Sequence, residues 1–235
     1  YKLPLPSGLH GDALMHVLYL HGFASSAQSS KAAFFRARLA AHGVEVHTPD
    51  FNLPDFSTLT VSRMLAQVHG TIQALPAGPV TLIGSSLGGF VAVHAALADR
   101  ARVDRLVLLA PALDFGGNRM RELGDRGIDE WRRTDRLDVF HYGYGRLMAV
   151  HYELYADAAR YDAINARLDL PIQIFQGRRD TAVDPETVER WARARPNVDL
   201  HLLDDDHQML GSLDTIWRET SRFLGLVSGS GGDGA

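Results

Sequence analysis

Gly84-Ser85-Ser86-Leu87-Gly88-Gly89 stands between an apolar, β-branched run, Pro79-Val80-Thr81-Leu82-Ile83, and a run of small and apolar residues, 90–98. The pattern predicts a buried strand that turns sharply into a helix. In such a turn the central serine takes a strained backbone conformation, and glycines two positions away on each side let strand and helix approach closely. The sequence therefore predicts Ser86 as a nucleophile whose hydroxyl is held out at the end of a sheet.

The turn has two other interpretations. Ser85 is the alternative nucleophile, but Ile83 stands two positions before it, where the motif requires glycine. The turn could also be purely structural, because a Gly-x-Ser-x-Gly match alone arises by chance. The expected strand before the turn and helix after it favour the catalytic interpretation with Ser86.

The composition is that of a globular domain. The chain has 235 residues, of which 46% are hydrophobic and 22% charged. We expect one domain over residues 1–227, long enough for a large core, and a flexible tail over 228–235 that contains only Gly, Ser, Asp and Ala. A net charge of −4 offers no basic surface for nucleic acid, and the absence of cysteine excludes disulfides and thiol chemistry.

No segment directs the protein to a compartment. A run of 18 apolar residues is absent, so no membrane span is expected. The cytoplasm is therefore the default expectation, although the chain begins at Tyr1 rather than Met, which leaves the removal of a leader open. The sequence does not decide the oligomeric state.

Short apolar runs alternate with helical patterns along most of the chain. This alternation predicts an α/β fold with about six mainly parallel strands and helices on both faces of the sheet. We expect strands at 16–20, 44–47, 79–83, 105–110, 172–176 and 198–203. We expect helices from about 31 to 42, 59 to 75 and 90 to 98, a helix that begins after Asp184, and a last helix that Ser212 caps.

The alternation stops between the fourth and fifth of these strands. Residues 112–169 are rich in arginine, aspartate, glycine and aromatic residues, and a hairpin is expected around Gly143-Tyr144-Gly145. We interpret this segment as a small lid inserted into the domain, not as a second domain.

A serine nucleophile needs a base, and the base needs a carboxylate to orient it. Parallel sheets of this kind carry reactive groups on loops beyond the carboxyl ends of their strands. Two such loops carry suitable residues, Asp180 after the strand 172–176 and His207 after the strand 198–203. Asp184 and Asp114 are the alternative acids, but Asp184 has a structural explanation as a helix N-cap. The sequence predicts the triad Ser86, His207 and Asp180.

The oxyanion of a tetrahedral intermediate needs hydrogen-bond donors. The amide of Leu87, directly after the nucleophile, is one expected donor. The amide of Phe23 is the other, because Gly22 permits a close approach of the loop that follows the strand 16–20. His21 is expected to brace this loop. The sequence contains no His-Glu-x-x-His motif or close pair of metal ligands, so we predict neither a metal nor another cofactor.

These residues resemble the α/β-hydrolase superfamily over nearly the whole chain, from Val17 to Leu224. Leu20-His21-Gly22-Phe23-Ala24-Ser25-Ser26, followed by Ser29 and Lys31, is similar to small bacterial carboxylesterases of the YqiA-like kind, as is the turn at Ser86. The resemblance implies an α/β-hydrolase fold and a cofactor-free serine hydrolase of esters or thioesters, with Ser86, His207 and Asp180 as the triad. The chain departs from the smallest members in its longer, aromatic-rich 112–169 segment.

Aromatic side chains in that segment are candidates for an acyl-binding pocket, because apolar and aromatic residues line most small-molecule sites. The alternative is that they form the core of the segment itself. The candidates are Phe115, Trp131, Phe140, Tyr142 and Tyr144, with Tyr152 and Tyr155 in the same set.

The sequence thus predicts a carboxylesterase that cleaves short to medium acyl esters of small molecules through an acyl-enzyme. An acyl-thioesterase or a perhydrolase with the same triad is the first alternative. The second is a non-catalytic, ligand-binding module with a hydrolase fold. A haloalkane dehalogenase is disfavoured, because that reaction needs a carboxylate where Ser86 stands.

Overall fold

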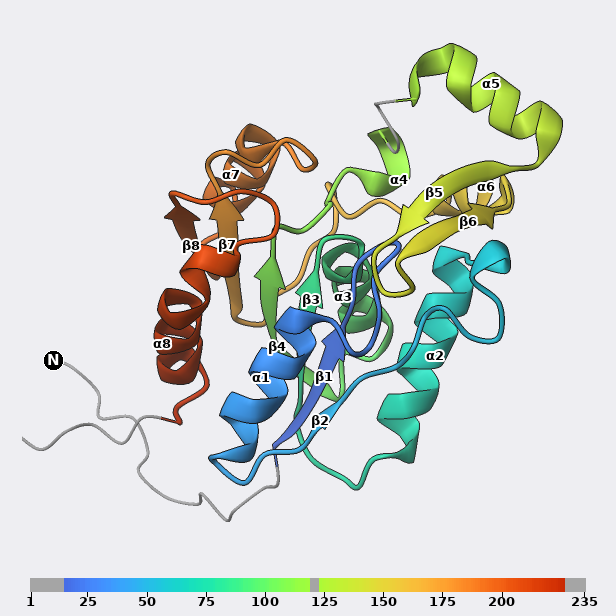
Figure 1. The fold of residues 1–235 in the computed structure, drawn as a ribbon. Coiled ribbons are helices and arrows are strands. Elements are labelled where there is room, and N and C mark those ends of the chain that lie inside the picture. Colours follow the sequence, from blue (N-terminus) through green and yellow to red (C-terminus); the bar gives the residue numbers. More distant parts are fainter. Residues whose placement is uncertain (1–14, 119–122, 227–235) are drawn as a thin grey trace, which may run out of the picture.

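A computed structural model describes residues 15–118 and 123–226. Its centre is a sheet of six strands with the order β2-β1-β3-β4-β7-β8, and every neighbouring pair is parallel (Figure 1). The strands are β1 (His16–Leu20), β2 (Val46–His47), β3 (Val80–Ser85), β4 (Val103–Leu109), β7 (Ile172–Gly177) and β8 (Val198–Leu203). The predicted parallel α/β sheet is confirmed.

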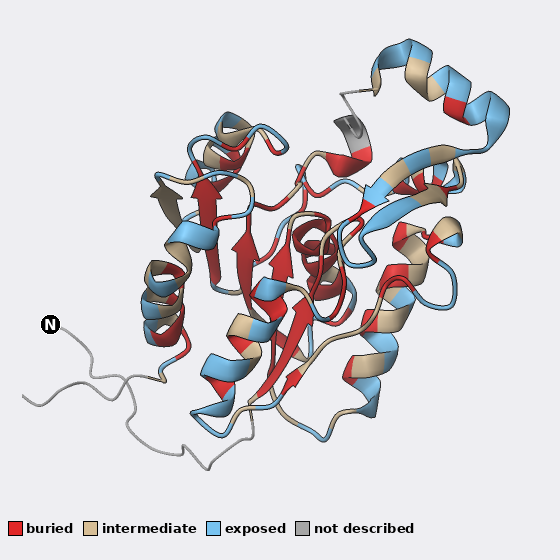
Figure 2. Ribbon diagram, in the orientation of Figure 1, coloured by how far each residue is buried: buried red, intermediate tan, exposed pale blue. Residues whose placement is uncertain are grey.

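The sheet is buried between two layers of helices. All residues of β1, β3 and β7 are buried (Figure 2). This burial explains why these strands are rich in apolar residues, because a parallel sheet covered on both faces has no solvent-exposed side. The carboxyl ends of the parallel strands consequently meet at one edge of the sheet, where the loops that carry the predicted triad begin.

Two helices cover one face of the sheet and three cover the other. α1 (Ser30–Ala40) and α8 (Leu213–Phe223) bury Phe35, Leu39 and Ile216 against β1, β4 and β7. On the opposite face, α2 (Val61–Ala74), α3 (Leu87–Ala98) and α7 (Pro185–Arg193) enclose the larger core cluster. Figure 1 shows these two layers on either side of the strands.

Side-chain caps fix where several of these helices begin. Ser29 accepts a hydrogen bond from the Ala32 amide at the start of α1, and Thr60 accepts one from the Arg63 amide at the start of α2. The prediction that Ser212 caps α8 is wrong about the capping hydrogen bond. The helix does begin after this residue, but the hydroxyl donates to Asp205 Oδ2 (2.8 Å) and makes no capping bond.

Between β4 and β7, the described residues form three α-helices and a hairpin. They are α4 (Phe115–Asn118), α5 (Gly124–Thr134), the antiparallel pair β5 (Leu137–His141) and β6 (Arg146–Val150), and α6 (Glu153–Ala158). The hairpin turns at residues 142–145, where the sequence predicted it. The whole hairpin lies above α2 and beside the loop that follows β1 (Figure 1).

This segment is attached to α2 by a buried carboxylate. Asp157 in α6 is only 3% exposed, and its two oxygens accept hydrogen bonds from the Ser62 amide (2.7 Å) and hydroxyl (2.6 Å). The predicted tail over 228–235 and most of the irregular first residues lie outside the described residues. Within the described ranges, no helix is long and apolar enough to cross a membrane.

Candidate active site

Ser86 lies at the junction of β3 and α3 in a conformation that a non-glycine residue rarely takes. Its φ is 53° and its ψ is −117°. A backbone in such a sparsely populated region costs roughly 1–3 kcal/mol and persists only where its surroundings impose it. Here the Ser86 amide donates to Leu109 O (2.9 Å), while its carbonyl accepts from the Gly89 and Ala112 amides (2.9 and 3.1 Å). The strained turn that the sequence predicted is present.

The glycines of the motif are required by close contacts. A Cβ atom on Gly84 would lie 2.5 Å from the Gly88 carbonyl oxygen, and one on Gly88 would lie 2.0 Å from Leu20 O. Neither distance is possible for a real side chain. The strand, the helix and the end of β1 therefore approach as closely as they do only because these positions lack side chains.

Asp180 and His207 come together at the carboxyl ends of β7 and β8. Asp180 Oδ2 accepts a hydrogen bond of 2.8 Å from His207 Nδ1. The two loops meet because Gly177 leaves room, since a Cβ there would lie 2.5 Å from Asp206 O. The structure thus joins the predicted acid to the predicted base.

Asp180 is a buried carboxylate that accepts several hydrogen bonds. Its side chain has no exposed surface, and besides His207 it accepts hydrogen bonds from Gln176 Nε2 (3.0 Å) and from the Ala182 and Val183 amides (2.9 and 2.8 Å). Burial alone would raise the pKa of Asp180, but these donors and the nearby imidazole outweigh it and hold the pKa below its ordinary value. Asp180 is therefore ionised at neutral pH.

An ionised Asp180 fixes the tautomer of His207. The carboxylate can only accept, so Nδ1 carries the proton and Nε2 carries the lone pair that a general base uses. Among the described residues, Nε2 of His207 has no hydrogen-bond partner, and no hydrogen bond joins it to Ser86. Catalytic hydrogen bonds of this kind often tighten only when substrate binds.

The alternative acids have other surroundings. Asp184 caps α7, where its oxygens accept from the Glu186 and Thr187 amides (3.3 and 3.2 Å). Asp114 lines a cavity of about 410 Å³ together with Tyr161. Asp180 is the acid that is hydrogen-bonded to His207.

The loop after β1 lies directly against Ser86. A Cβ on Gly22 would be 3.3 Å from Ser86 Cβ and 3.9 Å from its Oγ, so a side chain there would crowd Ser86. Within the described part of the chain, neither the Phe23 amide nor the Leu87 amide donates a hydrogen bond. Leu87 is also the first residue of α3, where the helix dipole favours negative charge. Both predicted oxyanion donors are thus available.

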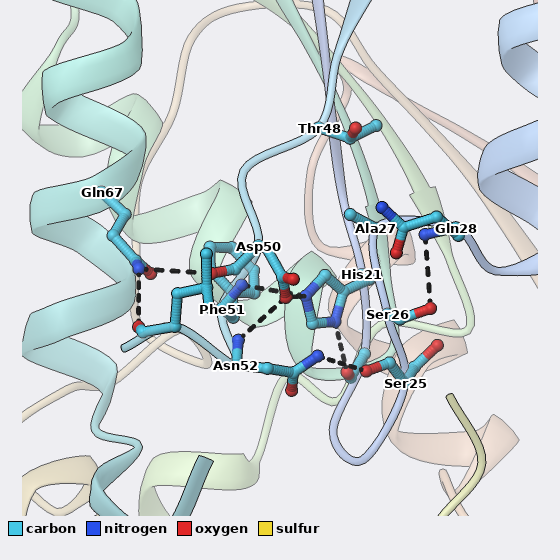
Figure 3. Close-up of polar contacts among 12 residues, drawn as sticks. His21, Ser25, Ser26, Ala27, Gln28, Thr48, Asp50, Phe51, Asn52 and Gln67 are labelled. Carbon is cyan, nitrogen blue, oxygen red and sulfur yellow. Dashed lines mark hydrogen bonds and ion pairs between the residues drawn. The ribbon is translucent and has the colours of Figure 1, made fainter. Parts of the chain in front are cut away.

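His21 braces this loop, as the sequence predicted. Its ring is buried, Nδ1 donates to Gly22 O (2.9 Å), and Nε2 accepts from the Phe51 amide (3.0 Å) (Figure 3). Both ring nitrogens are therefore occupied by the backbone of two loops. His21 is not placed to act as a base.

Lys31, in the first turn of α1, is a charged neighbour of the site to which the sequence assigned no role. Its side chain is buried, and burial lowers its pKa to about 8, although the charges of Asp180, Asp206 and Asp205 act in the opposite direction. The only signal in the sequence is that lysine occurs at positions 2 and 31 alone, whereas arginine supplies every other positive side chain apart from histidine.

Replacing Lys31 by methionine is expected to move the acidic limb of kcat/KM to higher pH, because Asp180, Asp205 and Asp206 lose a nearby cation and then favour positive charge beside them more strongly. The pH profile would be measured with a chromogenic ester from about pH 5 to pH 8. Arg38→Met is the matched control, because Arg38 is on the same helix but pairs with the exposed Asp214. An equal shift of the acidic limb in both variants, or no shift in Lys31→Met, would contradict the expectation that the Lys31 ammonium offsets the charge of these carboxylates.

Two of the five aromatic residues predicted to line a pocket are buried among other side chains. Trp131 is 1% exposed, its indole N–H donates to Val150 O (3.0 Å), and its ring packs edge-on against Tyr152. Trp131 thus belongs to the core of the 112–169 segment, as the alternative to an acyl-binding role predicted. Phe115 packs edge-on against Phe90 of α3, with ring centroids 5.7 Å apart.

The other three aromatic residues are on the β5–β6 hairpin. Phe140 and Tyr142 are 49% and 75% exposed, and their rings pack edge-on. Tyr144 stacks on His141, with ring centroids 4.3 Å apart. A role for any of them in binding an acyl chain stays a prediction.

The structure offers no obvious metal centre in residues 15–118 and 123–226. No group of three or more histidine, aspartate or glutamate side chains in these ranges is placed to hold a metal ion.

The profile of one sequence family, described as Uncharacterised protein family (UPF0227), matches residues 16–223. This match spans all six strands of the sheet and the loops that carry Ser86, Asp180 and His207. The chain belongs to this family. The resemblance drawn from the loop after β1 and from the turn at Ser86 is therefore confirmed at the level of the family.

Curated relatives of this UPF0227 member include a thioesterase and a lipase. Palmitoyl-protein thioesterase ABHD10, mitochondrial, from Bos taurus is 25% identical over 164 residues, covering 66% of this chain and 53% of that protein. Lipase LipV from Mycobacterium tuberculosis (strain ATCC 25618 / H37Rv) is 50% identical over 94 residues, covering 37% of this chain and 36% of that protein. The chain thus spans about half the length of the thioesterase and about a third of the lipase.

Solved structures show the same fold. Alpha/beta hydrolase domain-containing protein 10 from mouse superposes with a TM-score of 0.77 at 20% identity, covering 95% of this chain and 93% of that one. Est1E from Butyrivibrio proteoclasticus with ferulic acid bound superposes with a TM-score of 0.73 at 18% identity, covering 92% of this chain and 90% of that one. This UPF0227 member therefore has the α/β-hydrolase fold, and its relatives support a hydrolase of the α/β family.

Proposed function

We propose that this protein is a serine hydrolase that cleaves short to medium acyl esters of small molecules. The observation that carries the proposal is the 2.8 Å hydrogen bond between His207 Nδ1 and the buried carboxylate of Asp180, at the edge of the sheet where the strained turn presents Ser86. A base oriented by a carboxylate near a serine at a strand-to-helix turn is the arrangement that activates a hydroxyl for acyl transfer.

In the first half of the reaction, Ser86 Oγ attacks the carbonyl carbon of the ester while His207 Nε2 takes the hydroxyl proton. The carbonyl π electrons move to oxygen, and the amides of Phe23 and Leu87 donate to this oxyanion. When the tetrahedral intermediate collapses, the bond to the alkoxy group breaks and His207 returns the proton to the leaving oxygen. The acyl group is then bound to Ser86 as an ester.

In the second half, water takes the place of the alcohol. His207 removes a proton from water as it attacks the acyl carbonyl, and the second intermediate releases the carboxylic acid as the proton returns to Ser86 Oγ. Throughout, ionised Asp180 holds the imidazole in the correct tautomer and stabilises the imidazolium that forms twice in each cycle.

An acyl-thioesterase is the alternative that a comparison favours, because four relatives are named palmitoyl-protein thioesterase. The same triad also suits a perhydrolase. The proposed esterase and these alternatives differ in the leaving group or in the final nucleophile, not in the residues that act. A non-catalytic binding module is disfavoured because Ser86, His207 and Asp180 are all present.

The test is turnover of two matched acyl series, p-nitrophenyl esters and acyl-coenzyme A thioesters, each from acetyl to lauroyl. We expect the esters to be hydrolysed with an optimum at short to medium chains and the thioesters to react more slowly. Faster turnover of the thioesters would identify a thioesterase. If a folded sample hydrolyses neither series, the enzyme proposal fails and the binding module becomes the better explanation.

A further inference from the structure

The loop that follows β1 is held in a conformation that it would not keep unaided. Ala24 has a φ of 51°, in the left-handed region that favours glycine. This residue directly follows Phe23, whose amide is a proposed oxyanion donor. A loop of this kind holds its geometry only where neighbouring groups impose it, so the groups that contact residues 21–26 decide where the Phe23 amide points.

One of these groups is the side chain of Asn52, on the loop after β2. Its Nδ2 donates to Ser25 O (2.9 Å), and the Asn52 amide donates to Asp50 Oδ1 (3.0 Å). Figure 3 shows Asn52 reaching the Ser25 backbone on one side, while His21 contacts Asp50 and Phe51 on the same loop. The loop after β2 therefore holds the loop after β1 at both of its ends.

The tip of the β5–β6 hairpin completes the connection. His141, which is fully buried, donates from Nε2 to Asn52 Oδ1 (3.0 Å), and the Tyr142 amide donates to Ala24 O (2.8 Å). Gly143 lies so close that a Cβ there would be 2.8 Å from Ser26 Cβ. The side chain of Asn52 thus bridges the hairpin and the loop beside Ser86.

This bridge requires one tautomer of His141. Its Nδ1 accepts from the Tyr144 amide (3.2 Å), so the ring is neutral and Nε2 carries the proton that goes to Asn52. Burial lowers the pKa of His141 and so favours this neutral form. Every polar atom of the bridge has a partner, as a buried network needs.

We propose that Asn52 and His141 are positioning residues for the oxyanion hole, through which the hairpin tip holds the loop after β1 in the conformation that aims the Phe23 amide at the reacting carbonyl oxygen. The inference rests on the proposed function, because it assigns these residues a role in the reaction of Ser86. It makes the hairpin a fixed part of the catalytic apparatus and not a freely opening lid.

Other contacts anchor the hairpin, so the bridge can be removed without detaching it. The His151 amide donates to Ser57 O (2.8 Å), and Asp157 binds Ser62 of α2. We therefore expect loss of the bridge to loosen residues 21–26 while the fold and the hairpin remain. Substrate binding in the ground state changes little, whereas stabilisation of the oxyanion falls, so kcat decreases and KM does not.

The test compares four variants by kcat and KM, normalised by titration of reactive serine. Asn52→Ala and His141→Asn are expected to lower kcat by about 10- to 100-fold, less than the loss of an entire oxyanion donor. His141→Gln keeps a donor near the position of Nε2 and is expected to restore most of kcat, whereas asparagine keeps only an acceptor near Nδ1. Asn197→Ala is the matched control, because its amide binds Leu168 O and Leu170 O at the opposite end of β8.

Hydrogen exchange of the amides in residues 22–26, measured on the same four variants, gives a readout that does not depend on turnover. Faster exchange in Asn52→Ala and His141→Asn, but not in His141→Gln or Asn197→Ala, is expected. Unchanged exchange, unchanged kcat in an esterase, or an equal loss of kcat in Asn197→Ala would overturn the inference. Should the wild-type protein hydrolyse no ester, altered exchange would still support the bridge and only the proposed function would fail.

Discussion

Ser86→Ala is expected to lower kcat for p-nitrophenyl esters by about 10⁵- to 10⁶-fold, because no other group can form the acyl-enzyme and the remaining donors only polarise the substrate. The free energy of unfolding is expected to stay the same or to rise, since alanine at φ 53° carries no extra bulk and the hydroxyl caps nothing in α3. Both quantities would be measured, turnover by steady-state kinetics and stability by urea denaturation.

Ser85→Ala is the matched control for this loss. Ser85 is the neighbouring serine of the same turn, but it is buried, and it interacts with the phenol of Tyr19 in β1. We expect this variant to stay folded and to keep kcat within a few-fold of wild type. A large loss of kcat in Ser85→Ala with activity retained in Ser86→Ala would reassign the nucleophile.

Asp180→Asn is expected to lower kcat by about 10³- to 10⁴-fold. The asparagine amide can donate to Nδ1, which stabilises the tautomer with the proton on Nε2 and leaves no lone pair to accept from Ser86. The variant also removes the buried negative charge that stabilises the imidazolium. Steady-state kinetics would measure the loss, and a fluorophosphonate would report in parallel how far the reactivity of the serine has fallen.

Asp184→Asn separates this effect from a general loss of charge in the same loop. Asp184 caps α7, and asparagine caps helices about as well as aspartate. We expect kcat within two-fold of wild type. The free energy of unfolding is expected to change by roughly a few tenths of a kcal/mol at most, because the two residues cap helices about equally well. A similar loss of kcat in both variants would show that the acid has been assigned wrongly or is shared.

The parallel sheet and the turn at Ser86 could be predicted because short runs of neighbouring residues determine both. Strand length, β-branched content and glycine spacing are set by neighbours in the chain, and the βα alternation then fixes which strand ends lie together. Asp180 and His207 followed from that placement without any information on their contact.

The connection between the hairpin and the loop after β1 could not be predicted in this way. Asn52 and His141 are 89 positions apart, and nothing near either residue marks it as part of a buried pair. Trp131 and Tyr142 are both aromatic, yet Trp131 is buried and Tyr142 is exposed, because contacts with residues distant in the sequence, such as Val150 for Trp131, decide which side chain is covered. No pattern near Lys31 indicates its place beside Asp180, since its charged neighbours come from two distant loops.

The most direct measurement of the central claim is to treat the folded protein with a fluorophosphonate and locate the adduct by peptide mass spectrometry. The proposed chemistry predicts a single adduct on Ser86, formed in wild type and in Ser85→Ala and absent from Ser86→Ala. An adduct on Ser85 or on a serine outside this turn, or no adduct on a folded sample, would contradict the assignment of Ser86 as the nucleophile.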